Sequence, residues 1–189
     1  MAPVQKNAAR RGAHLAFLDE SGFLLIPNVR KTWAPVGQTP RLRHSYRHDR
    51  VSVISALTVA PRRHRFGLYF DLHLRNITGA EVITFLRYLL RHLRGSVVLL
   101  WDGGKIHRHH DVQVFLQRYP RVEVHRFPGY APELNPDEFV WTQAKRDLAN
   151  TDHDGVVPLT LHVVRSLQRI GQSQVLLRSC LHASDLLWP

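Results

Sequence analysis

Three acidic positions, each next to an apolar segment, are the residues in this sequence best suited to chemistry. Asp19 ends the apolar run HLAFLD, and Asp102 directly follows the run SVVLLW. The third position is Asp137 or Glu138, in the segment PELNPDE. A carboxylate in apolar surroundings is costly unless a cation compensates its charge, and carboxylate oxygens suit Mg²⁺ or Mn²⁺. The acids therefore predict a divalent-metal site.

A site of this kind can break and join phosphodiesters. Two metal ions about 3.5–4 Å apart activate water or a 3′-hydroxyl and stabilise the leaving oxygen of an in-line displacement. Taken singly, Asp19 and Asp102 are each explained as an acid that caps a turn; together, at equivalent strand ends, they favour a shared site. The cluster of His107, His109 and His110 matches no metal-ligand spacing, and a helix start explains it better.

The hydrophobic pattern indicates the elements that position the first two acids. Asp19 ends a strand predicted at 14–19, and a second apolar run follows at 23–26. Asp102 follows residues 96–101, whose short and continuous apolar pattern is typical of a strand buried on both faces. Because open sheets place their sites just outside the carboxyl ends of such strands, both acids are expected at one sheet edge.

The third acid lies at a predicted helix start. The Asn-Pro pair of PELNPDE places Pro at the first helical position, and acids in a first turn complement the helix dipole. This explains one of Asp137 and Glu138 and leaves the other free to face the sheet end. On a helix, Glu138, Trp141 and Lys145 share one side, which puts Glu138 above an apolar stripe and Lys145 within reach of a bound phosphate.

The rest of the pattern predicts an α/β fold. Three strands, a helix, a strand, a helix, a strand and further helices favour a mixed five-stranded sheet with helices on both faces, as in ribonuclease-H-like folds. Thr78 and Glu81 form a capping box before the first of these helices. Residues 32–40 are predicted to form a β-hairpin in which Trp33 packs on hydrophobic neighbours rather than on a base. The other predicted elements are strands at 51–59, 66–72 and 121–127 and helices at 79–94, 109–119, 137–149, 157–170 and 174–182.

Positive charge is concentrated in the first third of the chain. The 189 residues have a formal net charge of +11, of which residues 1–65 supply +9. Because these bases flank strand-like segments, they favour a phosphate-contacting surface over a merely solvated basic face, and the expected partner is nucleic acid. The candidate DNA-contacting residues of this region are Arg41, Arg43, Arg47, Arg62, Arg63 and Arg65.

Length and composition bound the remaining possibilities. A chain of this length with 44% hydrophobic residues predicts one globular domain at 14–189. The basic tail at 1–13 has no apolar segment behind it and is therefore not a secretory signal. No apolar run approaches the roughly 18–20 residues of a membrane-spanning helix, so no membrane association is expected. The lone Cys180, expected to be buried, cannot form an internal disulfide and favours a reducing, cytoplasmic compartment.

Several segments together resemble the catalytic domain of the insertion sequence 630 transposases, a bacterial branch of the mariner-like superfamily of DDE transposases. The resemblance runs from about residue 14 to the end of the chain, and GYAPELNPDEFVW at 129–141 is its most specific motif. The other matching segments are LAFLDESGFLL at 15–25, TWAPVGQTP at 32–40, VSVISALT at 51–58, VVLLWDGGKIHR at 97–108 and LLRSC at 176–180.

The resemblance implies a ribonuclease-H-like domain that cleaves and joins DNA strands at transposon ends with two Mg²⁺ ions, or with Mn²⁺ in their place. By motif position, the catalytic and metal-binding acids are Asp19, Asp102 and Glu138. His107 and Arg108 match the motif and are expected to contact DNA or position the site. The implied partners are terminal inverted repeats, target DNA and a second copy of the chain, in the cytoplasm of a bacterium.

Three departures from the family pattern matter. Gly103 and Gly104 replace the Asn-Ala of many relatives, which is expected to loosen the turn at Asp102. The interval from Asp102 to Glu138 is one residue longer than is common; Asp137 would restore it, but a loop insertion is cheap and the motif favours Glu138. Full-length relatives also carry an N-terminal helix-turn-helix region. The chain is therefore expected to be a catalytic half that needs a separately encoded helix-turn-helix chain or, alternatively, an inactive DNA-binding remnant.

Overall fold

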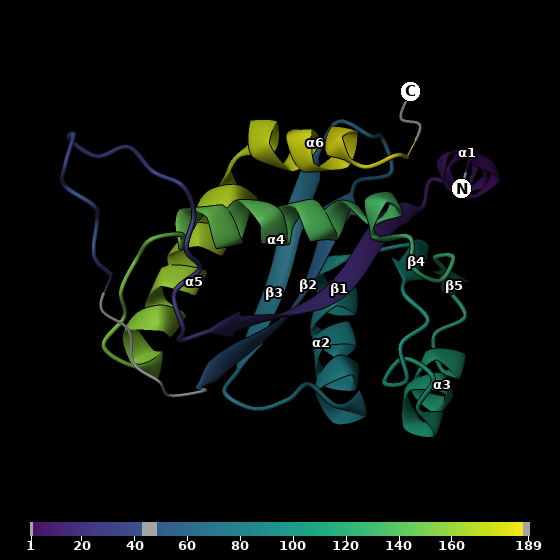
Figure 1. Ribbon diagram of the computed structural model, residues 1–189. Helices are drawn as coiled ribbons and strands as arrows, with labels where there is room; N and C mark the ends of the chain where they lie inside the picture. The colour runs from purple at the N-terminus through teal and green to yellow at the C-terminus, as the bar shows by residue number, and fades with distance from the viewer. Residues whose placement is uncertain (1, 43–48, 187–189) are drawn as a thin grey trace.

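The computed structural model describes residues 2–42 and 49–186, which form helical layers on the two faces of a central sheet (Figure 1). Within these residues the strands form one five-stranded sheet in the order β3-β2-β1-β4-β5. The elements are α1 (Ala2–Arg10), β1 (His14–Leu24), β2 (Arg50–Val59), β3 (Phe66–His73), α2 (Gly79–His92), β4 (Val97–Trp101), α3 (His110–Gln117), β5 (Val122–Arg126), the 3₁₀ turn η1 (Pro132–Leu134), α4 (Pro136–Asp147), α5 (Val156–Gln172) and α6 (Gln174–Ala183). Strands β1, β2 and β3 pair antiparallel, and β4 and β5 add parallel to β1. The predicted mixed sheet is confirmed.

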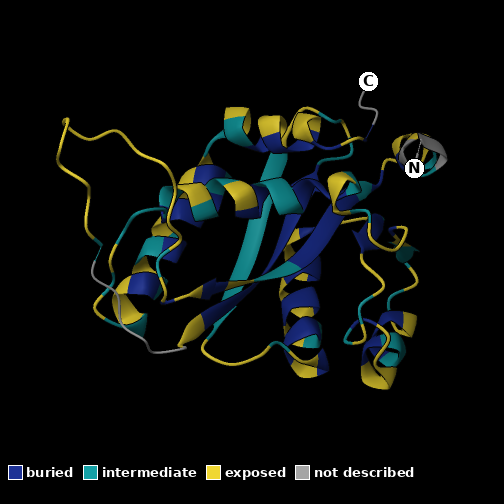
Figure 2. Ribbon diagram, in the orientation of Figure 1, coloured by how far each residue is buried: buried dark blue, intermediate teal, exposed yellow. Residues whose placement is uncertain are grey.

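Successive side chains of β1 enter two different cores, because a strand points them alternately to opposite faces. Leu15 and Phe17 pack with α4, α5 and α6, whereas Ala16 and Leu18 pack with α2 and α3. Figure 2 shows the buried residues gathered on the central strands and on the inner sides of the helices. β4 is buried at all five positions, as its apolar pattern predicted. Cys180 is buried in the first of these cores.

The first strand is longer than the sequence predicted. The apolar runs at 14–19 and 23–26 belong to one strand, because β1 pairs with β2 from Leu15 to Leu24. Asp19 therefore lies inside β1 and not at its end. On its other side, however, β1 pairs with β4 only as far as Phe17. Asp19 thus occupies the first stretch of β1 that β4 no longer covers.

Two segments differ from their predictions. The tail predicted at 1–13 contains α1, and Ala8 and Ala13 are fully buried in the core. The hairpin predicted at 32–40 is absent, because Pro35 and Pro40 lack a backbone N–H and the segment makes a single tight turn closed by the Gln38 N–H and the Pro35 carbonyl oxygen. Trp33 is 99% exposed, so its predicted packing is wrong. The other predicted elements begin and end within a few residues of the observed ones.

None of the helices in the described ranges combines the length and the apolar character that crossing a membrane requires.

The capping box predicted before α2 is present. The Thr78 side chain accepts from the N–H of Ala80, and the Glu81 carboxylate accepts from the N–H of Thr78 at 2.9 Å. Glu81 also accepts from the Arg75 guanidinium at 2.8 Å. Hydrogen bonds from the Thr78 side chain and backbone lower the pKa of Glu81 from 4.5 to about 2. A depressed pKa means that the folded state is stabilised by the ionised form, so this stabilisation is present above about pH 4.5 and is lost as pH falls toward 2.

We therefore expect Glu81→Gln, which keeps an acceptor for Thr78 but cannot ionise, to be less stable than wild type at neutral pH. The difference in free energy of unfolding should shrink steadily between about pH 4.5 and 2. Urea unfolding followed by circular dichroism at a series of pH values measures it. The exposed Glu133 is the matched control, and Glu133→Gln should follow wild type. A difference between wild type and Glu81→Gln that is independent of pH would contradict this account.

Candidate active site

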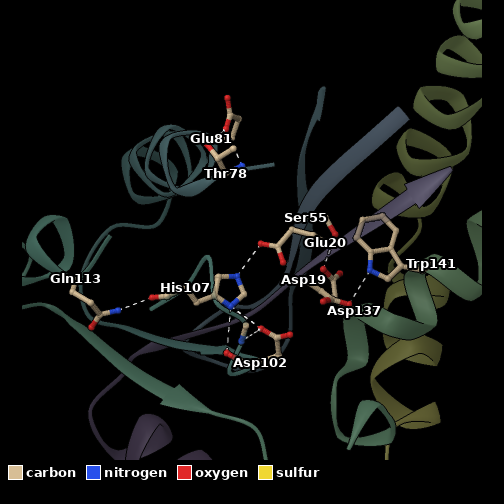
Figure 3. A network of polar contacts seen from close by, with 11 residues as sticks. Asp19, Glu20, Ser55, Thr78, Glu81, Asp102, His107, Gln113, Asp137 and Trp141 are labelled. Carbon is tan, nitrogen blue, oxygen red and sulfur yellow. Dashed lines mark hydrogen bonds and ion pairs between the residues drawn. The ribbon is translucent and has the colours of Figure 1, made fainter. Parts of the chain in front are cut away.

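The register of β1 and β4 places Asp19 and Asp102 side by side. The last paired residues are Phe17 and Leu100, so two further residues bring Asp19 level with Asp102, the residue after β4. Phe17 and Leu100 both belong to the core on the α4 side, and the alternation of side chains directs both acids to that side. Adjacent strands lie about 4.8 Å apart. The predicted meeting of these acids at one sheet edge is therefore found (Figure 3).

Asp19 is held by burial and by an indole. Its side chain is 8% exposed, and Trp141 Nε1 of α4 donates to its Oδ2 at 3.0 Å. Burial first, and then the negative charges of Glu138 and Glu20, raise the pKa of Asp19 to about 8, against smaller lowering by the hydrogen bonds from the Trp141 indole and the Glu20 backbone. A nearby cation would stabilise the ionised form of this carboxylate and so lower its pKa.

Asp102 is held by hydrogen bonds instead, since its side chain is 58% exposed. The Gly104 N–H donates to Oδ1 at 2.8 Å, and His107 Nδ1 contacts the same oxygen at 2.7 Å. The His107 hydrogen bond is the main reason that the pKa of Asp102 is lowered. A Cβ at position 104 would lie 2.9 Å from Oδ1, so glycine allows the carboxylate to fold back onto this N–H. The Gly103-Gly104 departure therefore holds Asp102 in a close turn rather than loosening it.

His107 is buried behind Asp102 and does not face solvent. Its ring stacks on Trp101 with centroids 4.3 Å apart and planes 2° from parallel, and only 1% of the side chain is exposed. Its Nε2 lies 2.9 Å from Glu20 Oε1, so both ring nitrogens are occupied. Burial alone lowers the pKa of His107, but hydrogen bonds to Asp102 and Glu20 outweigh it and raise the pKa to about 10. Of the two roles expected for His107, its burial favours positioning the site over contact with DNA.

The two candidates for the third acid differ sharply in their surroundings. Asn135 caps α4 by accepting from the Asp137 N–H at 3.2 Å. Asp137 is fully buried, and the Ser55 hydroxyl donates to its Oδ2 at 2.6 Å. Its Oδ1 is buried without a hydrogen-bond partner among the described residues. Burial raises the pKa of Asp137 well above its ordinary value, and the charge of Asp19 adds to this. Glu138 is only half-buried.

Sequence reasoning missed three groups that complete the arrangement. Ser55 lies opposite Asp19 in β2, Glu20 follows Asp19, and the Trp141 indole reaches Asp19 from α4. The polar Ser55 within the apolar strand VSVISALTV was an available signal, as was the acidic pair at Asp19 and Glu20. No sequence signal pointed to the indole as a donor, because Trp141 was assigned to an apolar stripe.

The acids of the site, Asp19, Asp102 and Glu138, offer carboxylate oxygens, which are the ligands that hard divalent cations prefer. Burial, and after it repulsion among the clustered acids, raises the pKa of Asp19 and Asp137, and a nearby cation would relieve both effects. In the described part of the chain, no group of three or more His, Cys, Asp or Glu side chains is already arranged as a metal cage. The donor set fits Mg²⁺ or Mn²⁺.

The predicted DNA-contacting residues are spread over the molecule. Arg62, Arg63 and Arg65 lie in the β2–β3 turn, which starts beyond Val59 at the sheet end opposite the acids, since Val59 pairs with Leu15. The structure therefore does not bring these three arginines to the acidic site.

The other basic candidates lie elsewhere. Lys145 is near the end of α4, with its ammonium 6.0 Å from the centre of the Phe23 ring. Arg41 and Arg108 are exposed. Arg43 and Arg47 fall outside the described residues.

His109 serves as a helix cap and not as part of a metal site. It is the N-cap of α3, and its Nδ1 accepts from the Asp111 N–H at 3.4 Å. This agrees with the helix start that the sequence favoured for the histidine cluster.

Comparison with solved structures identifies the fold. The Mos1 mariner paired end complex with Mn shares 16% identity, with a TM-score of 0.61, over 100% of this chain and 61% of the Mos1 chain. The catalytic domain of Mos1 mariner transposase shares 14% identity, with a TM-score of 0.51, over 98% and 93%. The intasome of simian T-cell lymphotropic virus shares 16% identity, with a TM-score of 0.55, over 93% and 56%. The ribonuclease-H-like fold is confirmed, and this chain spans about three fifths of the Mos1 transposase in the first of these structures.

Comparison with protein families adds the sequence relationship. Mos1 complexes were crystallised with Mn and with Mg. A search of curated proteins found no match. The family model described as DDE superfamily endonuclease matches residues 14–155, which include Asp19, Asp102 and Glu138. With three quarters of its length inside that match, the chain belongs to the DDE superfamily of endonucleases.

Proposed function

We propose that this endonuclease domain is the catalytic part of a DNA transposase that cuts and rejoins strands at terminal inverted repeats and in target DNA. The observation that supports this most is that Asp19 of β1 is level with Asp102, the residue after β4, while Glu138 of α4 is close enough to Asp19 for its charge to act on it. The fold shared with the Mos1 transposase supports the same function. The narrower assignment to the insertion sequence 630 branch rests on the sequence motifs.

Asp19, Asp102 and Glu138 would hold two Mg²⁺ or Mn²⁺ ions. When bound, such ions supply an activated water or 3′-hydroxyl and stabilise the leaving oxygen of the phosphodiester. The chain itself orients the acids: Trp141 holds Asp19 through Oδ2, and Gly104 holds Asp102 through Oδ1. Asp19, with a pKa of about 8, would be deprotonated more readily if a cation were bound beside it.

Glu138 is favoured as the third acid over Asp137 because of access. Asp137 is fully buried and bonded to Ser55, so its carboxyl faces the interior and not an approaching phosphate. Glu138 is half-buried, and its charge acts on Asp19. Burial raises the pKa of Asp137 well above its ordinary value, so its surroundings disfavour the ionised form, and its bond to Ser55 joins α4 to β2.

DNA would extend across more than the acidic site. Arg41, Arg108 and Lys145 are proposed to contact DNA, Arg108 next to Asp102, whereas the β2–β3 turn would contact it at the sheet end opposite the acids. A separately encoded helix-turn-helix chain and a second copy of this chain are proposed as protein partners in the assembled complex.

Asp102→Asn is expected to abolish metal-dependent nicking while preserving the fold. The amide is the same size and still accepts from Gly104, but it lacks the charge. We expect nicking of inverted-repeat DNA to fall at least about 10³-fold, since a metal-held carboxylate contributes several kcal/mol. A gel assay of strand breakage with Mg²⁺ or Mn²⁺ measures this, and calorimetry with Mn²⁺ measures binding. Asp111→Asn, at an exposed acid of α3, is the matched control.

Equal nicking by wild type and Asp102→Asn would remove Asp102 from the mechanism. A wild-type protein that binds DNA but neither binds Mn²⁺ nor nicks would instead identify the chain as an inactive DNA-binding fragment.

Glu138→Gln and Asp137→Asn are expected to behave differently. Glu138→Gln should lose nicking by a comparable factor, because it removes a metal-holding charge. Asp137→Asn should keep nicking and thermal stability near wild type, since an amide has the size of the carboxyl group, its oxygen can still accept from Ser55, and burial there disfavours a charge. Nicking rates and melting temperatures of both variants decide between them. The reverse pattern would make Asp137 the third acid.

A further inference from the structure

Asp102 lacks the burial that fixes the orientation of Asp19. It is the first residue after β4, more than half exposed, and followed by two glycines. A carboxylate in such a position is free to rotate unless other groups hold it. The atoms that hold Asp102 are the Gly104 N–H and His107 Nδ1, and both use Oδ1. Oδ2 is not used by either contact.

The His107 ring is held by stacking on one face and by polar contacts at both ring nitrogens. One face of the ring lies flat on Trp101, Nε2 meets Glu20 Oε1 at 2.9 Å, and Nδ1, beside its contact with Asp102 Oδ1, lies 3.3 Å from the Asp102 backbone carbonyl oxygen. The backbone of His107 is held as well, because its carbonyl oxygen accepts from Gln113 Nε2 at 2.7 Å. A carboxylate only accepts hydrogen bonds, so Asp102 and Glu20 each take one ring N–H. Figure 3 shows the ring lying between the two acids. The ring therefore cannot turn without losing one of the two bonds.

Glu20 reaches His107 because β1 continues beyond the point at which β4 ends. Glu20 follows Asp19 in β1, so its side chain leaves the opposite face of the sheet, on the side of α2 and α3. β4 has already ended at this level, which lets the Glu20 carboxylate meet the ring from the loop after β4. Glu20 therefore contacts the acidic site through His107, whereas its neighbour Asp19 belongs to the site directly.

We infer that Glu20 and His107 are positioning residues that fix the Asp102 carboxylate by Oδ1 and keep Oδ2 available to a metal ion. Glu20 fixes the orientation of the His107 ring, and the ring fixes the orientation of the Asp102 carboxylate. This inference rests on the proposed function in taking Asp102 as a metal-holding acid. Partners that orient a metal-holding side chain in this way commonly change metal affinity by about 10- to 100-fold when removed.

Three variants separate positioning from other roles. Glu20→Leu removes the acceptor, and Glu20→Gln keeps an acceptor for the ring but removes the charge. His107→Phe keeps a ring to stack on Trp101 but removes both N–H groups. Glu133→Leu, at an exposed glutamate on η1, is the matched control. Melting temperatures of all four variants establish that each is folded.

The first measurement needs neither metal nor activity. Nuclear magnetic resonance of the metal-free protein should detect two hydrogen-bonded imidazole N–H protons for His107 in wild type and Glu20→Gln. Glu20→Leu should lose the Nε2 proton signal and shift the ¹³Cγ resonance of Asp102. An unchanged Asp102 resonance in folded Glu20→Leu would overturn the inference.

The second measurement is Mn²⁺ affinity by calorimetry, together with the Mg²⁺ concentration that half-saturates nicking. We expect Glu20→Leu and His107→Phe to weaken both by about 10- to 100-fold, and Glu20→Gln and Glu133→Leu to stay close to wild type. If Glu20→Gln loses as much as Glu20→Leu, the charge of Glu20 acts on the metal directly and the inference is wrong.

The two proposals fail separately. If wild type neither binds Mn²⁺ nor nicks DNA, the proposed function fails, and the resonance of Asp102 in Glu20→Leu still decides whether Glu20 positions that acid. If wild type does both and Glu20→Leu matches it in affinity and resonance, only the positioning role fails.

Discussion

Unequal strand lengths on the two sides of β1 are the constraint on which this site depends. β2 pairs with β1 to its end at Leu24, whereas β4 ends at Trp101 and leaves β1 uncovered from Leu18 onward. At that step Asp19 and the chain leaving β4 come together. Were β4 two residues longer, Asp102 would be a ladder residue, and the loop with Gly104 would start farther from Asp19.

The two acids at this step are prepared in opposite ways. Asp19 is enclosed by the core and the Trp141 indole, which fixes its position but raises its pKa to about 8. Asp102 is open to solvent and is kept ionised by hydrogen bonds, which lower its pKa. Burial therefore fixes the position of Asp19 but disfavours its ionised form, whereas Asp102 favours the ionised form but depends on hydrogen bonds for its position. A cation bound to both would stabilise the ionised form of the buried Asp19 and would be attracted by the exposed charge of Asp102.

Local patterns predicted most of the fold, because they act within a few residues of the chain. The capping box at Thr78 starts α2, and the uninterrupted apolar run of β4 marks a central strand. β1 was divided in two because Glu20, Ser21 and Gly22 resemble a break, although these residues lie in the strand beyond the end of β4. Whether a polar stretch interrupts a strand or continues it depends on which neighbouring strand pairs with it, and this pairing is not visible in the local sequence.

The partners of the acids could not be predicted for the same reason. The bonds from Trp141 to Asp19, from Ser55 to Asp137 and between His107 and Glu20 join residues 122, 82 and 87 positions apart. Each depends on side-chain direction at the end of a strand or helix, which changes with a shift of one residue in register. Spacing alone left the choice between Asp137 and Glu138 open and the motif favoured Glu138; the complete burial of Asp137 supports that choice.

The position of the β2–β3 turn sets a length scale for bound DNA. Ser55 is level with Asp19, and Val59 lies four residues farther along β2, which corresponds to about 13 Å of strand. Successive base pairs rise about 3.4 Å. A duplex that touches both the acids and the arginines beyond Val59 must therefore follow the sheet for at least about four base pairs. Oligonucleotides shorter than this would reach one end of the sheet but not both.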